Sequence, residues 1–388
     1  MAYTGVKYIH SELPGAPVCN GVAGSLATVL EACLCNGFGL ITASSVVIAG
    51  GVATATFPTT HAFEPRIVAL VAGATPAGLN GEQRITATTA NSASWATSLP
   101  DGAATGTITL KVAPAGWTKA LSSGNVVAFK SASPAASGIL ARIDDSIGRY
   151  ARIRLVESMS DIDTLVGPTP TNGQRPGGAY ISKSDAASSA ARKWIVVASD
   201  KFAVVMIAYH GSYPNDYEPI VWGDYLSERV GDAWPCILVA NPSDSSGATS
   251  PGTYNALLNW AWDMGSWLVR PYTGIGGSLA GLIAKVGQPA AWSGDSSLPP
   301  GPNPINNAID LSPSIIVEGS STLGNRRAVL PAIYGLPHNM GSGFDSKDVI
   351  PSALGLPGHA IMAVRYYGGN SVAASRRFAI DITGPWEA

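Results

Sequence analysis

The sequence predicts a mainly β protein: an antiparallel sheet or sandwich with one packed N-terminal helix, plus a small antiparallel β-barrel. Short apolar runs recur along the chain, and abundant Gly (44) and Pro (28) residues separate them as turn residues. A helical spacing of apolar residues is clearest near the N-terminus. At 388 residues the chain exceeds the roughly 250 to 300 residues at which a single core stops growing, so we expect two units.

The helix is predicted to begin at Ser25, a candidate N-cap, and to end at Asn36-Gly37. Its apolar residues recur at positions i, i+3, i+4, i+7 and i+8: Leu26, Val29, Leu30, Cys33 and Leu34. This stripe must pack against another element. We expect that element to be the sheet formed by residues 202–241.

Residues 202–241 are predicted to form a three-stranded antiparallel meander. Phe202–Tyr209 is a compact apolar run bounded by turn residues, which is typical of a strand buried on both faces. Polar and apolar residues alternate within Tyr217–Arg229, and Trp234–Ala240 is a second apolar run.

Further strands are expected on both sides of the meander. Before it they are Trp117–Leu121, Asn125–Phe129, Ile139–Ile143, Tyr150–Glu157, Tyr180–Ser182 and Lys193–Ala198; after it they are Ser314–Glu318, Arg327–Leu330, His359–Tyr366 and Arg376–Ile382. Residues 158–178 are predicted to form a long surface loop, and 287–307 a surface segment. Residues 257–268 fit either a short helix or an aromatic-lined loop.

Residues 40–113 differ from the rest of the chain, because the strands predicted there are short and closely spaced. These are Ser45–Ala49, Val52–Phe57, Arg66–Val71, Gln83–Thr89 and Thr105–Val112. Asn80-Gly81 and Asp101-Gly102 suit tight hairpin turns. The segment therefore fits a small antiparallel barrel or sandwich of its own.

Charged residues make up only 13% of the chain, against about 25% in ordinary soluble proteins. Such a surface is typical of faces that neighbouring subunits cover. The formal net charge of -2 predicts no attraction to nucleic acid or to an anionic membrane. The densest basic cluster, Arg149, Arg152 and Arg154, is flanked by acidic residues, so we expect a solvated, self-paired strand face.

The four cysteines, Cys19, Cys33, Cys35 and Cys236, have no metal-ligand spacing. We expect them to be reduced, mostly buried, and part of a protein made in a cytoplasm. The N-terminus lacks the basic start and apolar core of a signal peptide. Residues 32–63 contain no Asp, Glu, Lys or Arg, but their apolar residues come in bursts rather than ~20 in a row, so no membrane insertion is predicted.

No catalytic, cofactor-binding or metal-binding motif is complete. The histidines, which are His10, His61, His210, His338 and His359, have no metal-ligand spacing. Gly274–Ser278 lacks the strand and helix that frame a phosphate-binding loop. The carboxylates between residues 144 and 163 are interpreted as salt-linked loop residues rather than a glycosidase pair. We therefore expect no enzyme activity, no cofactor and no metal.

Six tryptophans are concentrated within some seventy residues: Trp222, Trp234, Trp260, Trp262, Trp267 and Trp292. If exposed, they can anchor an interface or stack against a glycan. If buried, they fill the core of a sheet that is short of leucine. The sequence leaves both alternatives open.

Several stretches, in order along the chain, resemble a family of tailed-bacteriophage virion structural proteins. They are GVAGSLATVLEACLCNGFG at 21–39, AGWTKAL at 115–121, ARID at 141–144, ESMSDID at 157–163, VWGDY at 221–225, YTGIGGS at 272–278 and VLPAIYGLPH at 329–338. The resemblance covers most of the chain outside residues 40–113. It implies that this segment is an insertion into a main domain formed by residues 1–39 and 114–388.

The segment 40–113 itself resembles a small β-barrel module of phage tail proteins, named for its likeness to the first catalytic cysteine half-domain of ubiquitin-activating enzymes. The matching residues are GVATA at 51–55, THAF at 60–63, VAGA at 71–74 and LNG at 79–81. Glu64-Pro65-Arg66 stands where the module normally has a Gly-Asp turn. Such modules serve as scaffolding, so no ubiquitin chemistry is implied.

The resemblance and the composition together predict a structural component of a tailed-phage virion, assembled in the host bacterial cytoplasm. The favoured position is the tail: minor tail, baseplate or tail-fibre attachment. The expected partners are further copies of the chain, as a trimer or higher ring, and other virion proteins. Two alternatives remain: a capsid decoration protein, and a tail protein that binds a host receptor or glycan through exposed tryptophans.

Overall fold

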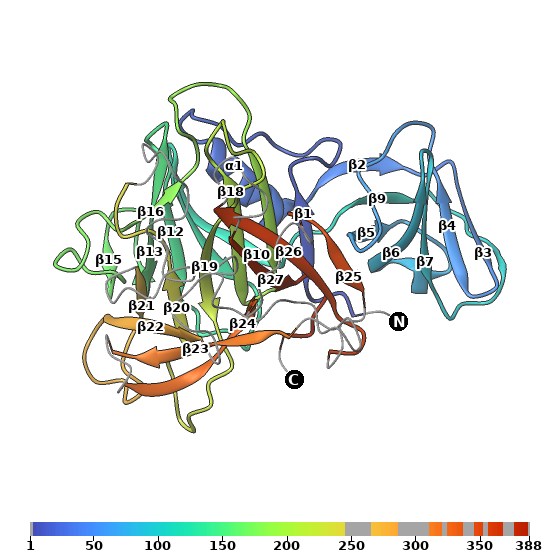
Figure 1. Cartoon of the computed structure of the whole chain (residues 1–388). Helices are drawn as coiled ribbons and strands as arrows, with labels where there is room; N and C mark the ends of the chain where they lie inside the picture. Colours follow the sequence, from blue (N-terminus) through green and yellow to red (C-terminus); the bar gives the residue numbers. More distant parts are fainter. Residues whose placement is uncertain are drawn as a thin grey trace.

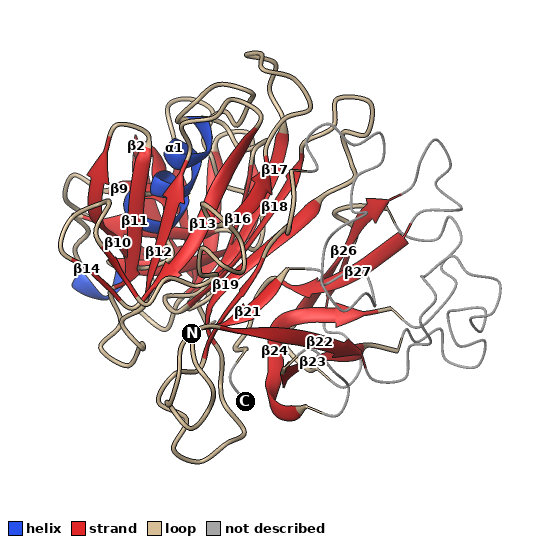
Figure 2. Cartoon of the chain, turned by 90° about the vertical axis from the view of Figure 1, so that its left-hand side faces the viewer, coloured by secondary structure: helices blue, strands red, loops and turns tan. Residues whose placement is uncertain are grey.

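The computed structural model describes residues 3–244, 265–285, 310–319, 324–336, 345–351, 356–367 and 376–386. Strands account for 48% of the structure, which confirms the prediction of a mainly β protein. Within these residues the strands form sheets of twelve, eight and five strands and a two-stranded ribbon, and paired strands run antiparallel (Figures 1 and 2). None of the described helices has the length and apolar character needed to cross a membrane.

The twelve-stranded sheet contains the predicted meander as its third to fifth strands. In spatial order its strands are β1 (Lys7–His10), β17 (Lys193–Ala198), β18 (Phe202–Ala208), β19 (Glu218–Asp224), β20 (Cys236–Val239), β21 (Ser266–Leu268), β22 (Leu279–Lys285), β23 (Ser312–Glu318), β24 (Asn325–Gly335), β27 (Arg376–Asp381), β26 (Ala360–Tyr367) and β25 (Val349–Pro351). Every residue of β18 is buried, because the strand has no polar side chain and both faces are covered. β1 lies within residues 1–23, for which the sequence predicts an extended, loop-like chain because Pro14-Gly15 and Pro17 exclude a helix.

The five-stranded sheet consists of the strands predicted between residues 117 and 182. They are β10 (Trp117–Ser123), β11 (Val126–Ser131), β12 (Leu140–Asp144), β13 (Tyr150–Val156) and β16 (Ala179–Ser182). Ile153 and Leu155 are buried in the core, while Arg152 lies on the opposite face, as strand alternation requires. The segment 158–178 contains the two-stranded ribbon of β14 (Ser158–Met159) and β15 (Leu165–Val166).

The eight-stranded sheet is formed entirely by residues 38–112. Its order is β2 (Phe38–Thr42), β9 (Thr109–Val112), β5 (Val68–Ala72), β6 (Gly81–Thr89), β7 (Ser92–Ala96), β4 (Val52–Thr56), β3 (Ser45–Ala49) and β8 (Gly102–Ala103), and a 3-10 turn spans η2 (Ala77–Leu79). Because its first and last long strands, β2 and β9, pair with each other, the chain enters and leaves this sheet side by side. Figure 1 shows the sheet at one side of the molecule.

Three strands of this sheet were missed in the sequence. β2 begins directly after the residues assigned to the helix end, β8 has only two residues, and β7 consists mainly of small or polar residues. β7 nevertheless buries Ala93 and Trp95 in alternation. Arg66, in the segment that replaces the Gly-Asp turn of the module, has a φ of 79°. Glycine adopts this backbone conformation without strain.

Side chains at the N-terminal strand attach the eight-stranded sheet to the main body. Arg84 of β6 donates hydrogen bonds to the backbone oxygens of Tyr3, Val6 and Thr383, at 2.8, 3.0 and 3.2 Å. Lys7 of β1 forms an ion pair with Glu82 at 2.8 Å. These contacts join residues from both ends of the chain to the sheet of residues 38–112.

The predicted helix is present as α1 (Ser25–Glu31) followed by a π-helical turn, η1 (Ala32–Asn36). Its apolar stripe is confirmed, since the five predicted residues are fully buried: Leu26, Val29, Leu30, Cys33 and Leu34. The helix end meets the start of the five-stranded sheet, where the amides of Ala115 and Gly116 donate to the carbonyls of Cys33 and Leu34. Figure 2 shows α1 beside this sheet.

The predicted cap at Ser25 is wrong. Gly24, at φ 83°, occupies the N-cap position, and the Asp145 carboxylate accepts hydrogen bonds from the amides of Leu26 and Ala27 at 2.8 and 3.1 Å. Asp145 follows β12 and forms a fully buried ion pair with Lys183. The helix is therefore capped by a residue 119 positions away in sequence, which local sequence patterns do not reveal.

The cysteines are free, as predicted: Cys19, Cys33 and Cys236 are buried and Cys35 is half-buried. Burial raises the pKa of the Cys19 and Cys35 thiols to about 12. Both thiols are therefore protonated and unreactive at neutral pH.

Candidate interaction cavity

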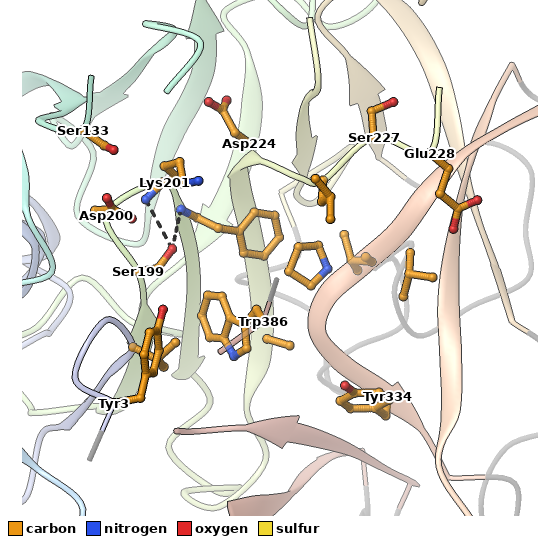
Figure 3. A pocket seen from close by; sticks show the side chains of 17 residues that line it. Tyr3, Ser133, Ser199, Asp200, Lys201, Asp224, Ser227, Glu228, Tyr334 and Trp386 are labelled. Carbon is orange, nitrogen blue, oxygen red and sulfur yellow. Dashed lines mark hydrogen bonds between the residues drawn. The ribbon is translucent and has the colours of Figure 1, made fainter. Parts of the chain in front are cut away.

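A cavity of about 640 Å³ opens where the two ends of the chain meet the twelve-stranded sheet (Figure 3). Its walls come from residues 3 and 6, the turn at 199–202, the segment 224–228 after β19, residues 329–334 of β24, and Trp386. Figure 3 shows Tyr3, Trp386 and Tyr334 on the side of the cavity opposite Asp224. One side of the cavity is therefore aromatic, and the other carries polar groups.

A bend in β24 creates the opening. Val329 of β24 pairs with Ile315 of β23, and Tyr334 of β24 pairs with Pro313 of β23. Five residues of β24 thus span the same distance as two residues of β23, so β24 bulges between Val329 and Tyr334. Pro331, within the bulge, has no amide hydrogen to donate to the sheet, and Ala332 has a φ of 66°. The sequence of β24 thus prevents regular pairing at this place.

The position of Trp386 is fixed by two contacts. Its indole Nε1 donates to the backbone oxygen of Asp381 at 3.1 Å, and its ring packs edge-to-face against Phe202 with a centroid distance of 5.9 Å. Tyr3, on the same side, is 46% exposed. An aromatic surface is therefore presented to the cavity by a fixed indole.

The polar side depends on Gly223, which has a φ of 124°. A Cβ atom at this position would lie 2.2 Å from the backbone oxygen of Lys201, so only glycine permits β19 to approach β18 this closely. The next residue, Asp224, accepts hydrogen bonds from the amide and the hydroxyl of Ser137 at 2.5 and 2.6 Å. Burial raises the pKa of the Asp224 carboxyl, and the Ser137 hydrogen bonds oppose this effect.

A second cavity of about 420 Å³ shares Lys201, Asp224, Leu226 and Ser227 with the first. It extends along the segment 225–235. Together the two cavities form what we call the interaction groove, defined by their lining residues.

A buried ion cluster holds the segment beneath this groove. Arg327 of β24 donates to the Asp232 carboxylate through Nε at 3.0 Å and Nη2 at 2.7 Å, and to Glu318 at 3.0 Å. Both Arg327 and Asp232 have fully buried side chains. The groove therefore lies on a fixed base, although Leu226 and Val230 of the same segment project from it with exposures of 61% and 103%.

The groove is lined by serine, carboxylate, lysine and arginine side chains, and Ser137 and Asp224 are hydrogen-bonded to each other. Among the residues that the structure describes, no histidine lines either cavity. Among the same residues, no group of three or more His, Cys, Asp or Glu side chains can hold a metal ion. The groove's geometry suits binding of another molecule.

Of the tryptophans singled out in the sequence, Trp222 is fully buried and Trp267 is 5% exposed. Trp234 is half-buried beneath the Arg270 guanidinium, which lies 4.6 Å from the centre of its ring. These residues do not line the 640 Å³ cavity, and Trp222 and Trp267 fill the sheet core. The other three tryptophans, at 260, 262 and 292, lie outside the described residues.

Two of the aromatic residues that line the cavity, Tyr3 and Trp386, were missed as candidate site residues. Each is isolated near one end of the sequence, so clustering along the chain gave no signal. Gly223 is a sequence signal that could have been used, since a glycine inside the strand VWGDY marks a close backbone approach.

The predicted carboxylates do not gather at one site. Glu157 pairs with Arg270 at 2.6 Å, Asp163 with Arg142 at 3.1 Å, and Asp145 with Lys183. They are salt-linked, as expected, but Asp145 is a core residue rather than a loop residue.

The histidines also lie apart. His10 contacts Glu64, His61 contacts two backbone oxygens, His210 contacts Asp185 and His359 contacts Asp381; His338 lies outside the described residues. Gly274–Ser278 is a turn whose Gly274 oxygen accepts a hydrogen bond from Arg270.

Comparisons with known proteins add no assignment: no protein-family model matches the chain, and no curated protein matches it.

Proposed function

We propose that this chain is a structural component of a tailed-phage virion, with the tail as its favoured position, and that it acts by assembly rather than by catalysis. The observation that carries the proposal is the interaction groove, where large apolar side chains remain exposed on a fixed base. Leu226 and Val329, which line the groove, are 61% and 37% exposed, and Val230, between the lining residues Arg229 and Gly231, is 103% exposed. The ordered resemblance to virion proteins and the low content of charged residues support the same reading.

The proposed occupant of the groove is a second copy of the chain, in a symmetric trimer or higher ring. Burying the exposed apolar side chains of the groove against a neighbour stabilises the contact by about 25 cal/mol per Å² of apolar surface. The segment 226–230 projects from each copy, so the same residues can insert into a cavity of the next. Contacts with other virion proteins would then use faces outside the groove.

The test is the oligomeric state of the purified protein, measured by gel filtration coupled to light scattering. We expect a stable homo-oligomer for the natural sequence and a shift towards monomer for Leu226→Asp, because the aspartate places a charge in the apolar contact. Val166→Asp is the matched control, since Val166 is 55% exposed on β15, outside the groove. A stable monomer at high concentration, together with absence of the protein from purified particles, would contradict the proposal.

A capsid decoration protein would assemble in the same way. The two positions are distinguished by antibody labelling of intact particles under the electron microscope. Label on the tail supports the favoured position, and label on the capsid surface supports the alternative.

A second candidate function, glycan binding on the host surface, is favoured by the aromatic side of the cavity. Tyr3 and Trp386 line the same space as Asp200 and Glu228, and sugars bind through aromatic faces together with hydrogen-bonding groups. Glycan-array binding that is lost in Trp386→Ala, in a protein with unchanged circular dichroism, would support this function. Binding that persists in that variant would count against it.

A further inference from the structure

An arginine cluster lies on the face of the five-stranded sheet that points away from its apolar core. Arg142 of β12 and Arg154 of β13 are directly opposite each other, and Arg152 lies two residues along on the same face. Cβ atoms of opposite residues in such sheets are about 5 Å apart, and like charges placed there repel each other. We call Arg142, Arg152 and Arg154 the arginine cluster.

Arg154 is a buried cation without a carboxylate partner among the described residues. It is 8% exposed, and its Nη2 donates to the side-chain oxygen of Asn172 and to the backbone oxygen of Arg175. Its Nε is buried and has no hydrogen-bond partner in the same part of the chain. Burial, followed by the positive charges of Arg142 and Arg152, lowers the pKa of Arg154.

Arg152 is also held by neutral groups. It donates to the backbone oxygens of Pro176 and Gly178, and its guanidinium carbon lies 3.6 Å from the centre of the Tyr180 ring. Its Nε, like that of Arg154, is buried without a partner in the described chain. The acidic residue opposite it, Asp144, lies 3.9 Å from Arg142 instead. The self-pairing predicted for Arg149, Arg152 and Arg154 is therefore wrong for Arg152 and Arg154, which have no carboxylate partner among the described residues.

One exposed carboxylate of the chain contacts the edge of the arginine cluster. Asp163, whose side chain is 80% exposed, accepts a hydrogen bond from Arg142 at 3.1 Å. This contact shows that the edge of the cluster is open to an anionic group. It satisfies Arg142 but leaves Arg152 and Arg154 with neutral partners.

We propose that the arginine cluster is an oxyanion-binding site, where a phosphate, sulfate or carboxylate group binds Arg142, Arg152 and Arg154 in place of Asp163. Buried charges in proteins are normally paired, and guanidinium groups match the planar geometry of carboxylates and the tetrahedral oxygens of phosphate. An anion here compensates three adjacent positive charges.

The test measures binding of inorganic phosphate by calorimetry and by the shift of the melting temperature, against sodium chloride at equal ionic strength. We expect phosphate to stabilise the natural protein and Arg154→Met to bind it about tenfold more weakly or worse, as the loss of a charge-assisted hydrogen bond predicts. Lys111→Met removes a positive charge from β9 of the eight-stranded sheet, where Lys111 donates to the backbone oxygen of Asn36, and should leave binding unchanged. An arm with acetate in place of phosphate distinguishes a carboxylate site from a tetrahedral-anion site.

Asp163→Asn gives an independent reading, because Asp163 is exposed and its replacement should not disturb folding. If Asp163 occupies the edge of the site, its neutralisation should raise phosphate affinity severalfold. The proposal is overturned if phosphate and acetate stabilise the protein no more than chloride does, or if Arg154→Met binds phosphate as well as the natural protein. Should Arg154→Met fail to fold, unchanged affinity in Asp163→Asn overturns it.

Discussion

Asp145 shows how a single buried residue fixes the arrangement of several elements. Its carboxylate caps α1 and pairs with Lys183, and Lys183 also donates to the backbone oxygen of Val22 at 2.8 Å. Burial raises the pKa of the Asp145 carboxyl, and the Lys183 charge opposes this shift. The carboxylate therefore depends on Lys183 to remain charged inside the protein.

Replacing Lys183 with Met should lower the free energy of unfolding by about 3 to 5 kcal/mol, because an unpaired charge is left in the core. Urea unfolding at pH 7 measures the effect. Adding Asp145→Asn to the same protein should recover part of the loss. The exposed lysine at 193 provides the control, since its replacement should cost less than about 1 kcal/mol; equal losses at both lysines would contradict the argument.

Arg66 affects stability through its backbone conformation. A non-glycine residue in the left-handed region costs about 1 kcal/mol or more, and Arg66 has a φ of 79°. Arg66→Gly should therefore raise stability by up to about 1 kcal/mol, measured by thermal unfolding. Lys130→Gly, within β11, should instead lower it, as glycine weakens a strand.

The ion pairs of Glu12 should make the stability of the folded protein depend on pH. Hydrogen bonds from Lys347 and Lys193 lower the pKa of the Glu12 carboxyl from 4.5 to about 2. A lowered pKa contributes stability above pH 4.5, and this contribution is lost as the pH falls towards 2. Glu12→Gln should thus be less stable than the natural protein at pH 7 and equally stable near pH 2. The difference should be small because the carboxylate is 43% exposed; a difference that persists at pH 2 would exclude this cause.

At the scale of elements, the sheet of residues 38–112 has the geometry of an insertion. Phe38 and Val112 are paired partners, so the two crossing points of the chain are adjacent. The twelve-stranded and five-stranded sheets, which are formed by the chain before and after this segment, share no strand with it. Polar contacts of Arg84, Lys7 and His10 join it to the rest of the protein, and its buried apolar residues belong to the same hydrophobic core.

Replacing residues 40–111 with two glycines should therefore leave the main body folded. We expect retained β-sheet circular dichroism with a lower melting temperature, because the Arg84 and Glu82 contacts with the N-terminal segment are lost. Arg84→Met in the full chain is the matched comparison and should reproduce part of the decrease. Loss of cooperative unfolding in the shortened protein would show that the two parts fold as one.

At the scale of the whole molecule, the low content of charged residues favours apolar contacts between copies of the chain. Contacts between apolar side chains are not weakened by screening, whereas contacts between surface charges are. The proposed oligomer should therefore persist, or increase, between 0.1 and 1 M sodium chloride, which sedimentation velocity can measure. Dissociation at high salt would indicate a charge-based contact and count against the groove as the interface.

The sequence by itself determined the fold class, the helix stripe and most strands, because burial leaves a local periodic pattern: β18 is apolar throughout, and Leu26 to Leu34 follow helical spacing. Only the tertiary structure decided the helix cap, the core position of Trp222 and the aromatic side of the cavity. Asp145, Tyr3 and Trp386 act through neighbours that are remote in sequence, and such contacts arise from chain topology. The physical reason is that periodicity records which face of an element is buried, but not which other element covers it.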